Sequence, residues 1–190
     1  ANANTGTGRT AVFRVVPNGV KTQESEIIQG NSYIPTTDGE FPIIAWTGVE
    51  ADKSLEKFPV MKASGINIYL GWYDDLETTL KVLDAAQKTG VKMITSCKDL
   101  LSVATAEEVV KAMMNHPALY AYHLKDEPEV NDLPGLGELV KKIKTIDSHH
   151  PCYINLYPYW AWGQELYSEN VESFIELVFV PFISFDNYPI

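Results

Sequence analysis

The 190-residue sequence lacks the features that mark several classes of protein. It contains no run of about 18 apolar residues, so no membrane-spanning segment is predicted. It contains no cluster of Lys or Arg, and 15 basic residues against 25 acidic ones give a net charge of −10. We therefore expect neither a nucleic acid nor an anionic membrane surface as a partner.

Motifs for metals, nucleotides and export are also missing. The sequence has no His-Glu-x-x-His and no Cys-x-x-Cys, so no metal site and no cofactor are predicted. The first eight residues are small and polar, with neither the basic nor the apolar region of a signal peptide. They fit the start of a mature secreted protein as well as a flexible cytoplasmic terminus.

From residue 41 the sequence repeats a short apolar run, a loop and an amphipathic segment of helical period. The apolar runs, which we predict to be strands, are residues 41–46, 66–72, 91–96, 119–124, 152–157 and 182–188. The segments that we predict to be helices lie near residues 52–64, 75–89, 105–115, 133–147 and 164–179. Strands that alternate with helices at this spacing indicate a parallel sheet.

Such a sheet is either doubly wound and open or closed into a barrel. No GxGxxG or P-loop follows the first strand, and polar and aromatic residues gather where the strands end, which is the active face of a barrel. We predict an α/β fold in which residues 41–190 form a parallel (β/α) TIM-type barrel. Six of the eight units are present, so the barrel is expected to be truncated after its sixth strand. Residues 1–40 are predicted to be an extension with short strands, because residues 11–34 resemble a β-hairpin.

The two cysteines fall at opposite ends of these predicted strands. Cys97 follows the end of the third strand, whereas Cys152 begins the fifth. Strands are about 17–20 Å long, and a disulfide needs Cα atoms within about 7 Å. We therefore expect both cysteines to be free.

Two polar segments at strand ends could carry chemistry. Residues 122–129 (TyrHisLeuLysAspGluProGlu) end the fourth strand and contain the adjacent carboxylates Asp126 and Glu127. A carboxylate above a hydrophobic barrel core has a raised pKa, which suits a general acid that works near neutral pH. Residues 184–189 (SerPheAspAsnTyrPro) end the sixth strand, and their polar side chains could bind a polyhydroxylated ligand. Each segment is also compatible with an ordinary solvated loop.

Aromatic side chains form the third group of candidates, because aromatic rings suit the apolar faces of sugars. They are Trp46, Trp72, Tyr73, Tyr157, Tyr159, Trp160 and Trp162. His123, within the fourth strand, is expected to have a structural role in the barrel interior.

The motifs AlaTyrHisLeuLysAspGluPro, HisProCysTyrIleAsnLeuTyrPro and IleSerPheAspAsnTyrPro lie in order on three consecutive predicted strands. Together they resemble the TIM-barrel glycoside hydrolases of clan A, and most of all the glycosidase-like barrels of gut Bacteroidetes. The resemblance implies export to the periplasm or cell surface. It also implies that Glu127 is the acid/base, although Asp126 replaces the usual preceding Asn that contacts the sugar 2-hydroxyl. The nucleophile of this clan is a Glu on a seventh strand.

These observations lead to a first hypothesis, a retaining glycosidase that acts on an oligosaccharide or polysaccharide. Glu127 would be catalytic, and a carbohydrate is the expected partner. The expected substrate-binding residues are Asp126, Trp46, Trp72, Tyr157, Asp186, Asn187 and Tyr188. The 190-residue chain alone should be inactive without the seventh-strand Glu.

Two alternatives remain open. The first is a non-catalytic carbohydrate-binding barrel, motivated by Asp126 in place of Asn. The second is a barrel enzyme of another chemistry, such as an aldolase with a Schiff-base lysine, although nothing marks Lys98 or Lys125 as desolvated.

Strand geometry adds one expectation about the paired carboxylates. Adjacent residues on a strand face opposite ways. We therefore predict that Glu127, and not Asp126, points into the barrel mouth, close to Tyr188.

Overall fold

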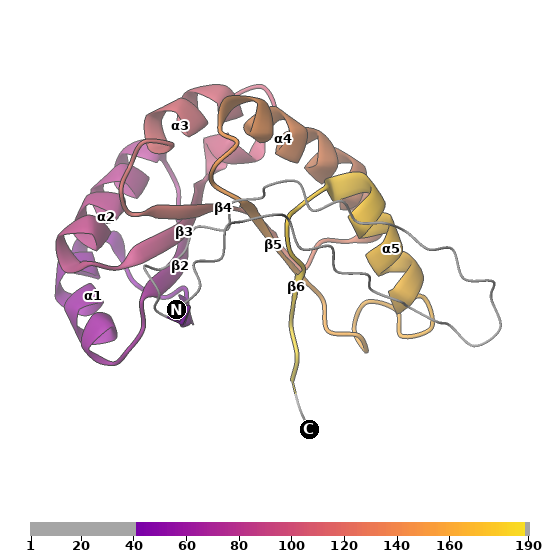
Figure 1. Ribbon diagram of the computed structural model, residues 1–190, viewed down its shortest axis with the longest axis horizontal. Coiled ribbons are helices and arrows are strands. Elements are labelled where there is room, and N and C mark those ends of the chain that lie inside the picture. The colour runs from indigo at the N-terminus through magenta and orange to yellow at the C-terminus, as the bar shows by residue number, and fades with distance from the viewer. Residues whose placement is uncertain (1–40, 189–190) are drawn as a thin grey trace, which may run out of the picture. The chain divides into compact units, whose positions relative to one another are not determined.

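The computed structural model describes residues 41–188, which form a curled parallel sheet with helices along its outer side (Figure 1). The strands are β1 (Ile44–Trp46), β2 (Ile68–Tyr73), β3 (Lys92–Cys97), β4 (Leu119–Asp126), β5 (Cys152–Leu156) and β6 (Ser184–Phe185). They lie side by side in chain order, and each neighbouring pair is parallel. A sheet in simple chain order belongs to a (β/α) barrel, because a doubly wound sheet reverses its order. The predicted barrel fold is confirmed as a half-barrel of six strands, while the extension predicted for residues 1–40 lies outside the described residues.

The helices alternate with the strands as the sequence pattern predicts. They are η1 (Ala51–Lys53), α1 (Ser54–Ala63), α2 (Leu76–Thr89), η2 (Lys98–Leu101), α3 (Ala106–Met113), η3 (Val130–Asp132), α4 (Leu133–Ile146) and α5 (Tyr167–Val178). In Figure 1 the five α-helices follow one another along the convex side of the sheet. The loops that follow the strands therefore meet at one end of the half-barrel, where a barrel places its active site.

Local sequence explains why α2 begins and ends where it does. Asp75 caps its start, since the carboxylate accepts a hydrogen bond from the backbone N–H of Thr78 at 2.7 Å. Gly90 follows its last turn with φ of 73°, a left-handed conformation that glycine adopts without steric cost. Leu83 and Ala86 are fully buried on the face that the sequence pattern assigns to the core.

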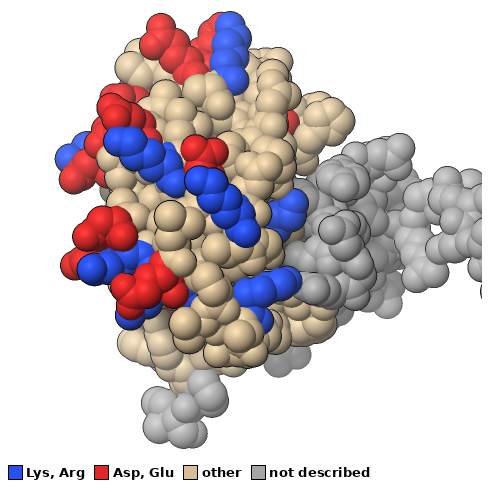
Figure 2. All heavy atoms as spheres, turned by 90° about the vertical axis from the view of Figure 1, so that its left-hand side faces the viewer, with Lys and Arg blue, Asp and Glu red and all other residues tan. Residues whose placement is uncertain are grey.

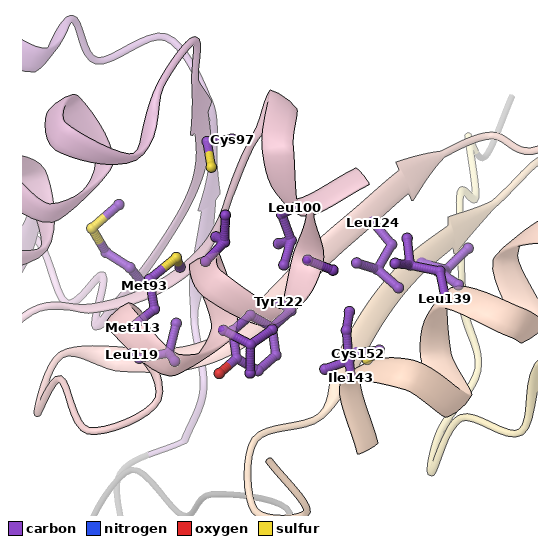
Figure 3. Packing of buried hydrophobic residues seen from close by; sticks show 14 of the residues in the cluster. Met93, Cys97, Leu100, Met113, Leu119, Tyr122, Leu124, Leu139, Ile143 and Cys152 are labelled. Carbon is purple, nitrogen blue, oxygen red and sulfur yellow. The ribbon is translucent and has the colours of Figure 1, made fainter. Parts of the chain in front are cut away.

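The main hydrophobic core lies between the sheet and the helices (Figure 3). Tyr122 and Leu124 of β4 point outward into it and meet Ile143 and Leu139 of α4. Both cysteines are buried free thiols in this core, with Cys97 at the end of β3 and Cys152 at the start of β5.

Charged side chains of both signs cover the helical side of the molecule (Figure 2). Lys81 pairs with Glu77 at 2.7 Å and Lys111 pairs with Glu107 at 2.7 Å, both at the i,i+4 spacing of one helix face. This face is a mixed, solvated surface, so it forms no basic patch of the kind that nucleic acid would require.

A second, smaller apolar cluster lines the concave side of the sheet. Its members are Ile68, Leu70, Ile94, Ala121 and Tyr153, with Tyr120 and Phe182 against them. Alternate residues of each strand therefore reach the interior of the half-barrel, and the residues that continue these rows toward the strand ends form the floor and the mouth of the candidate site.

Candidate functional site

The fourth strand is irregular just before its end, and this irregularity places the two adjacent carboxylates. His123 pairs with Tyr153 of β5, but the next paired residue of β4 is Lys125, so the register shifts at this point. Such a bulge inserts one extra residue and moves the following side chains to the other face. Asp126 consequently pairs with Asn155, on the same inner row as Tyr153.

Asp126 therefore faces the mouth of the half-barrel. Its Oδ1 accepts a hydrogen bond of 3.2 Å from Nδ2 of Asn155. The prediction that Asp126 would face away from the mouth is wrong, because the bulge breaks the strict alternation on which that prediction relied. The strand also continues to Asp126, two residues beyond the predicted end at Leu124.

Glu127 faces the same opening as Asp126. Its backbone has a φ of 46°, in the left-handed region that non-glycine residues seldom occupy. Its N–H donates to the carbonyl of Asn155 at 2.8 Å, and the buried Pro128 follows directly. This backbone turn places the Glu127 carboxyl beside Asp186, with which it makes a side-chain hydrogen bond.

Asp186 reaches the site from the segment after β6. Its backbone N–H donates to the carbonyl of Leu156 at 3.0 Å, which extends the pairing of β5 and β6 by one step. Its Oδ1 accepts from Nδ2 of Asn155 at 2.9 Å, and its Oδ2 accepts from the hydroxyl of Tyr188 at 3.0 Å. Tyr188 and Glu127 therefore meet at the same carboxylate, as the sequence analysis expects.

Asn155, at the end of β5, lies between these carboxylates. The Ser184 hydroxyl donates to its Oδ1 at 2.8 Å, and the hydroxyls of Ser184 and Tyr153 are 2.8 Å apart. Because the Ser184 proton is used toward Asn155, the hydroxyl of Tyr153 is the donor to Ser184. The hydrogen bonds thus run in one direction, from Tyr153 through Ser184 to Asn155 and then to the carboxylates.

The surroundings of Glu127 favour its protonated form. Removal from water raises the pKa of Glu127 above that of an ordinary glutamate, and the hydrogen bond to Asp186 raises it further. The negative charges of Asp126 and Asp186 act in the same direction. None of these three residues forms an ion pair within residues 41–188.

Aromatic rings form the floor of the site on the concave face. His123 stacks on Trp72, with ring centroids 5.1 Å apart, and its ring edge meets Trp46 at 6.3 Å. Tyr153 lies 6.2 Å from His123 and 6.4 Å from Trp46. Trp46 and Trp72 are 40% and 45% exposed, so they leave indole surface free beneath the carboxylates.

Other predicted residues lie at the rim. The hydroxyl of Tyr157 donates to Glu129 at 3.2 Å, and Trp160 packs against Tyr188 with ring centroids 6.5 Å apart. Asn187 is exposed and makes no side-chain hydrogen bond within residues 41–188. Trp162 is only 3% exposed and packs in the core, so it does not belong to the aromatic surface of the site.

Sequence reasoning missed Asn155, Ser184 and Tyr153 as members of the site. Asn155 is the single polar residue of an otherwise apolar strand and lies two positions after Tyr153, on the same face. That signal was present in the sequence. The partners of Asn155 were not readable, because they depend on the register between β4, β5 and β6.

The described residues contain neither a candidate metal site nor a helix that could cross a membrane. In residues 41–188 no group of three or more His, Cys, Asp or Glu side chains is arranged to hold a metal ion. No helix in the same range is long and apolar enough to cross a membrane.

The fold and this site define a partial TIM-type barrel with a cluster of carboxylates at the mouth and indole rings beneath them. Solved glycoside hydrolases have a similar fold. An endo-1,4-beta-mannanase from Eisenia fetida superimposes with a TM-score of 0.52 at 12% identity, over 70% of this chain and 60% of the mannanase. A family 5 glycoside hydrolase from Bacteroides vulgatus gives 0.50 at 13% identity, over 67% of this chain and 41% of the hydrolase.

An endo-laminarinase from Formosa also has this fold, with a TM-score of 0.50 at 14% identity, over 76% of this chain and 49% of the laminarinase. The chain therefore spans between 41% and 60% of these three structures. No protein-family model matches the sequence, and no curated protein matches it. At such low identities the likeness establishes the barrel fold, and the function must be argued from the site.

Proposed function

We propose that the protein is a glycoside hydrolase that acts on an oligosaccharide or polysaccharide, with Glu127 as its general acid/base. The observation that carries the proposal is the placement of the Glu127 carboxyl at the mouth of the barrel, in contact with Asp186 and beside Asp126. This placement raises the pKa of Glu127, which is the direction that a general acid working near neutral pH requires. The similarity of the fold to glycoside hydrolase barrels supports the same assignment.

The proposed chemistry uses that proton first and the resulting carboxylate second. Glu127 protonates the glycosidic oxygen as a nucleophile displaces it from the anomeric carbon, and the ionised Glu127 then removes a proton from the water that releases the sugar from that nucleophile. Trp46 and Trp72 offer exposed indole faces on which a sugar ring could stack. Tyr188 and Asp186 lie beside Glu127 and could accept or donate hydrogen bonds to sugar hydroxyls.

The second carboxylate of a retaining glycosidase has to lie about 5–5.5 Å from the acid, and that of an inverting enzyme about 6.5–9.5 Å away. Asp186 is in hydrogen-bonding contact with Glu127, which is too close for either arrangement. We therefore propose that Asp186 serves to raise the pKa of Glu127. The nucleophile would then lie on a seventh strand, as the clan resemblance implies.

The full-length protein provides the test. It should release reducing sugar from at least one member of a panel of β-mannans, β-glucans and related polysaccharides. Glu127→Gln should lower kcat by about 10²–10⁴-fold, because the general acid is lost while the shape of the side chain is kept. The matched control is Glu172→Gln on the exposed face of α5, which should leave kcat unchanged.

A Glu127→Gln enzyme as active as the wild type would rule out the assignment of the acid. A full-length protein that binds polysaccharide and hydrolyses none of the panel would favour a carbohydrate-binding barrel instead. The exposed indoles of Trp46 and Trp72 and the presence of Asp126 where the clan has Asn are the observations in favour of that second function.

A further inference from the structure

Asn155 is enclosed at the end of β5 and is only 2% exposed. Both protons of its amide are used, one toward Oδ1 of Asp126 and one toward Oδ1 of Asp186. Its oxygen is also occupied, since the hydroxyl of Ser184 donates to it at 2.8 Å. A buried amide is fixed in position when its two protons and its oxygen each form a hydrogen bond with a different residue.

The orientation of this amide is determined as well as its position. If the amide were turned over, its oxygen would face two carboxylates and its nitrogen would face the hydroxyl of Ser184. Asp126 and Asp186 would then lose the amide as a donor, and the amide oxygen would face their carboxylate oxygens with no proton between them. The two carboxylates therefore select the observed orientation, and the hydroxyl of Ser184 then donates to the amide oxygen.

Asp186 and Glu127 differ in the hydrogen bonds that their carboxyl oxygens accept. Asp186 accepts one hydrogen bond on each oxygen, from Asn155 and from Tyr188. No donor within residues 41–188 approaches the Glu127 carboxyl, whose contact is Asp186 itself. Asp126 and Asp186 lie close enough to Glu127 for their negative charges to raise its pKa, so the pKa of Glu127 depends on where these two carboxylates are held.

We propose that Asn155 is a positioning residue whose amide holds Asp126 and Asp186 on either side of it and thereby keeps both carboxylates beside Glu127. The meaning of this arrangement for catalysis depends on the proposed glycosidase function, because that function makes Glu127 the acid. Asn155 does not touch the reacting atoms in this scheme. It acts through the two aspartates.

Other groups that face Glu127 are few and come from the neighbouring elements. They are Asp126 beside it on β4, Tyr157 after β5, and Asp186 and Tyr188 after β6. The hydrogen bond to Asp186 is the main cause that raises the pKa of Tyr188, and burial is the main cause that raises the pKa of Tyr157, so both tyrosines remain neutral donors while the carboxyls titrate. Within residues 41–188, Asn155 is thus the one donor that contacts two of the three carboxylates.

The test is a carbon-13 NMR titration of the side-chain carboxyls in the 190-residue chain, in wild type and in Asn155→Ala. In the wild type the titration midpoint of Glu127 should lie above that of an ordinary glutamate. In Asn155→Ala it should fall toward the ordinary value, because the two aspartates are no longer held beside Glu127 and their charges raise its pKa less. Asn131→Ala makes the same change at an exposed asparagine of η3 and should leave the midpoint where it is in wild type.

A second variant keeps the test decisive if Asn155→Ala does not fold. Ser184→Ala removes the donor to the amide oxygen and the acceptor of the Tyr153 hydroxyl but leaves Asn155 beside both aspartates, so it should lower the Glu127 midpoint by less but in the same direction. The proposal is overturned if the midpoint stays unchanged in a folded Asn155→Ala or Ser184→Ala chain.

The titration does not depend on catalysis, which separates the two proposals. Should the midpoints move as expected while full-length Glu127→Gln remains fully active, the glycosidase assignment fails and the positioning role of Asn155 stands. Should Glu127→Gln be inactive while Asn155→Ala leaves the midpoint unchanged, the acid stands and the positioning role fails.

Discussion

The imidazole of His123 lies over the indole of Trp72, with ring centroids 5.1 Å apart and ring planes inclined by 17°. His123 is only 6% exposed, and its Nε2 has no hydrogen-bond partner within residues 41–188. Burial lowers the pKa of His123 to about 4, so the ring is neutral at physiological pH. The stack is therefore a contact between two neutral rings, and its stability should depend on pH.

The first prediction follows from this lowered pKa. In the unfolded chain His123 should take up a proton near its ordinary pKa of about 6.5, whereas the folded chain resists protonation until about pH 4. As the pH falls from about 6.5 to 4, the unfolded state binds the extra proton and the free energy of unfolding decreases by up to about 3 kcal/mol. His123→Phe should lose less stability over this interval than wild type, as measured by urea denaturation at a series of pH values.

The control for this prediction is His149→Phe, which replaces an exposed histidine. It should show the same pH dependence as wild type. If His123→Phe and wild type lost stability in parallel between pH 6.5 and 4, His123 would not be the buried neutral group described above.

The second prediction concerns Asp147, which follows α4 at the opposite end of the strands from the candidate site. Its Oδ2 accepts from the hydroxyl of Tyr122 at 2.7 Å and contacts Nδ1 of His150 at 2.6 Å, and the residue is 4% exposed. Burial acts to raise the pKa of Asp147, but these hydrogen bonds and those from backbone N–H groups outweigh it, so the pKa is lowered. Asp147→Asn should reduce the free energy of unfolding at pH 7 by about 2–3 kcal/mol, since hydrogen bonds to a charged acceptor are lost.

The pH dependence of this second effect has a definite sign. A carboxylate whose pKa is lowered by folding stabilises the protein above the pKa of the unfolded chain and ceases to do so as the pH falls through its folded value. The difference between wild type and Asp147→Asn should therefore shrink in acid, by urea denaturation. Asp52→Asn, at an exposed aspartate of η1, should change the stability by less than about 0.5 kcal/mol; a loss as large as that of Asp147→Asn would point to a general charge effect.

The sequence carried enough information to predict the barrel. Apolar runs of strand length alternate with amphipathic segments, and this periodicity depends only on which residues face the core. Gly65 and Gly90 mark the ends of α1 and α2 with φ of 86° and 73°, as expected of glycines after a helix. Trp46 and Trp72 reach the concave face, because they continue the inner rows of β1 and β2.

The sequence did not reveal how the carboxylates converge. The shift of register after His123 and the left-handed backbone of Glu127 depend on pairing between strands that are about 30 residues apart in the chain. The role of Asn155 depends on the same pairing. Residue types at the strand ends could therefore be predicted, whereas the direction of each side chain could not.

The third prediction concerns the packing of α4 against α5. A Cβ atom added at Gly137 would overlap the backbone carbonyl oxygen of Leu177, which cannot move without shifting α5. Gly137→Ala should therefore destabilise the chain by about 1–3 kcal/mol, despite the better helix propensity of alanine. Gly135, on the same helix, has open space where its Cβ would be, so Gly135→Ala should be neutral or stabilising by up to about 1 kcal/mol. Thermal denaturation of the two variants gives the comparison, and equal stabilities would contradict the close approach of the helices.

The fourth prediction uses the charge at the mouth of the half-barrel. Asp126, Glu127 and Asp186 converge there, and none of them forms an ion pair with a lysine, arginine or histidine of the described chain. A sugar acid would bring another negative charge into this cluster, and like charges at short range in a partly desolvated site repel strongly. If the site binds carbohydrate as we propose, a neutral oligosaccharide should bind more tightly than an oligouronate of equal length.

Isothermal titration calorimetry with such a matched pair of oligosaccharides measures this preference. At low ionic strength the difference in Kd should be about tenfold or more, and added salt should reduce it, because salt screens the repulsion. Asp126→Asn should narrow the difference by improving the affinity for the oligouronate, whereas Glu172→Gln, which removes one charge from the exposed face of α5, should leave it as in wild type. An oligouronate that bound as tightly as its neutral counterpart would show that sugars do not approach these three carboxylates, and the binding surface would then have to be sought elsewhere on the chain.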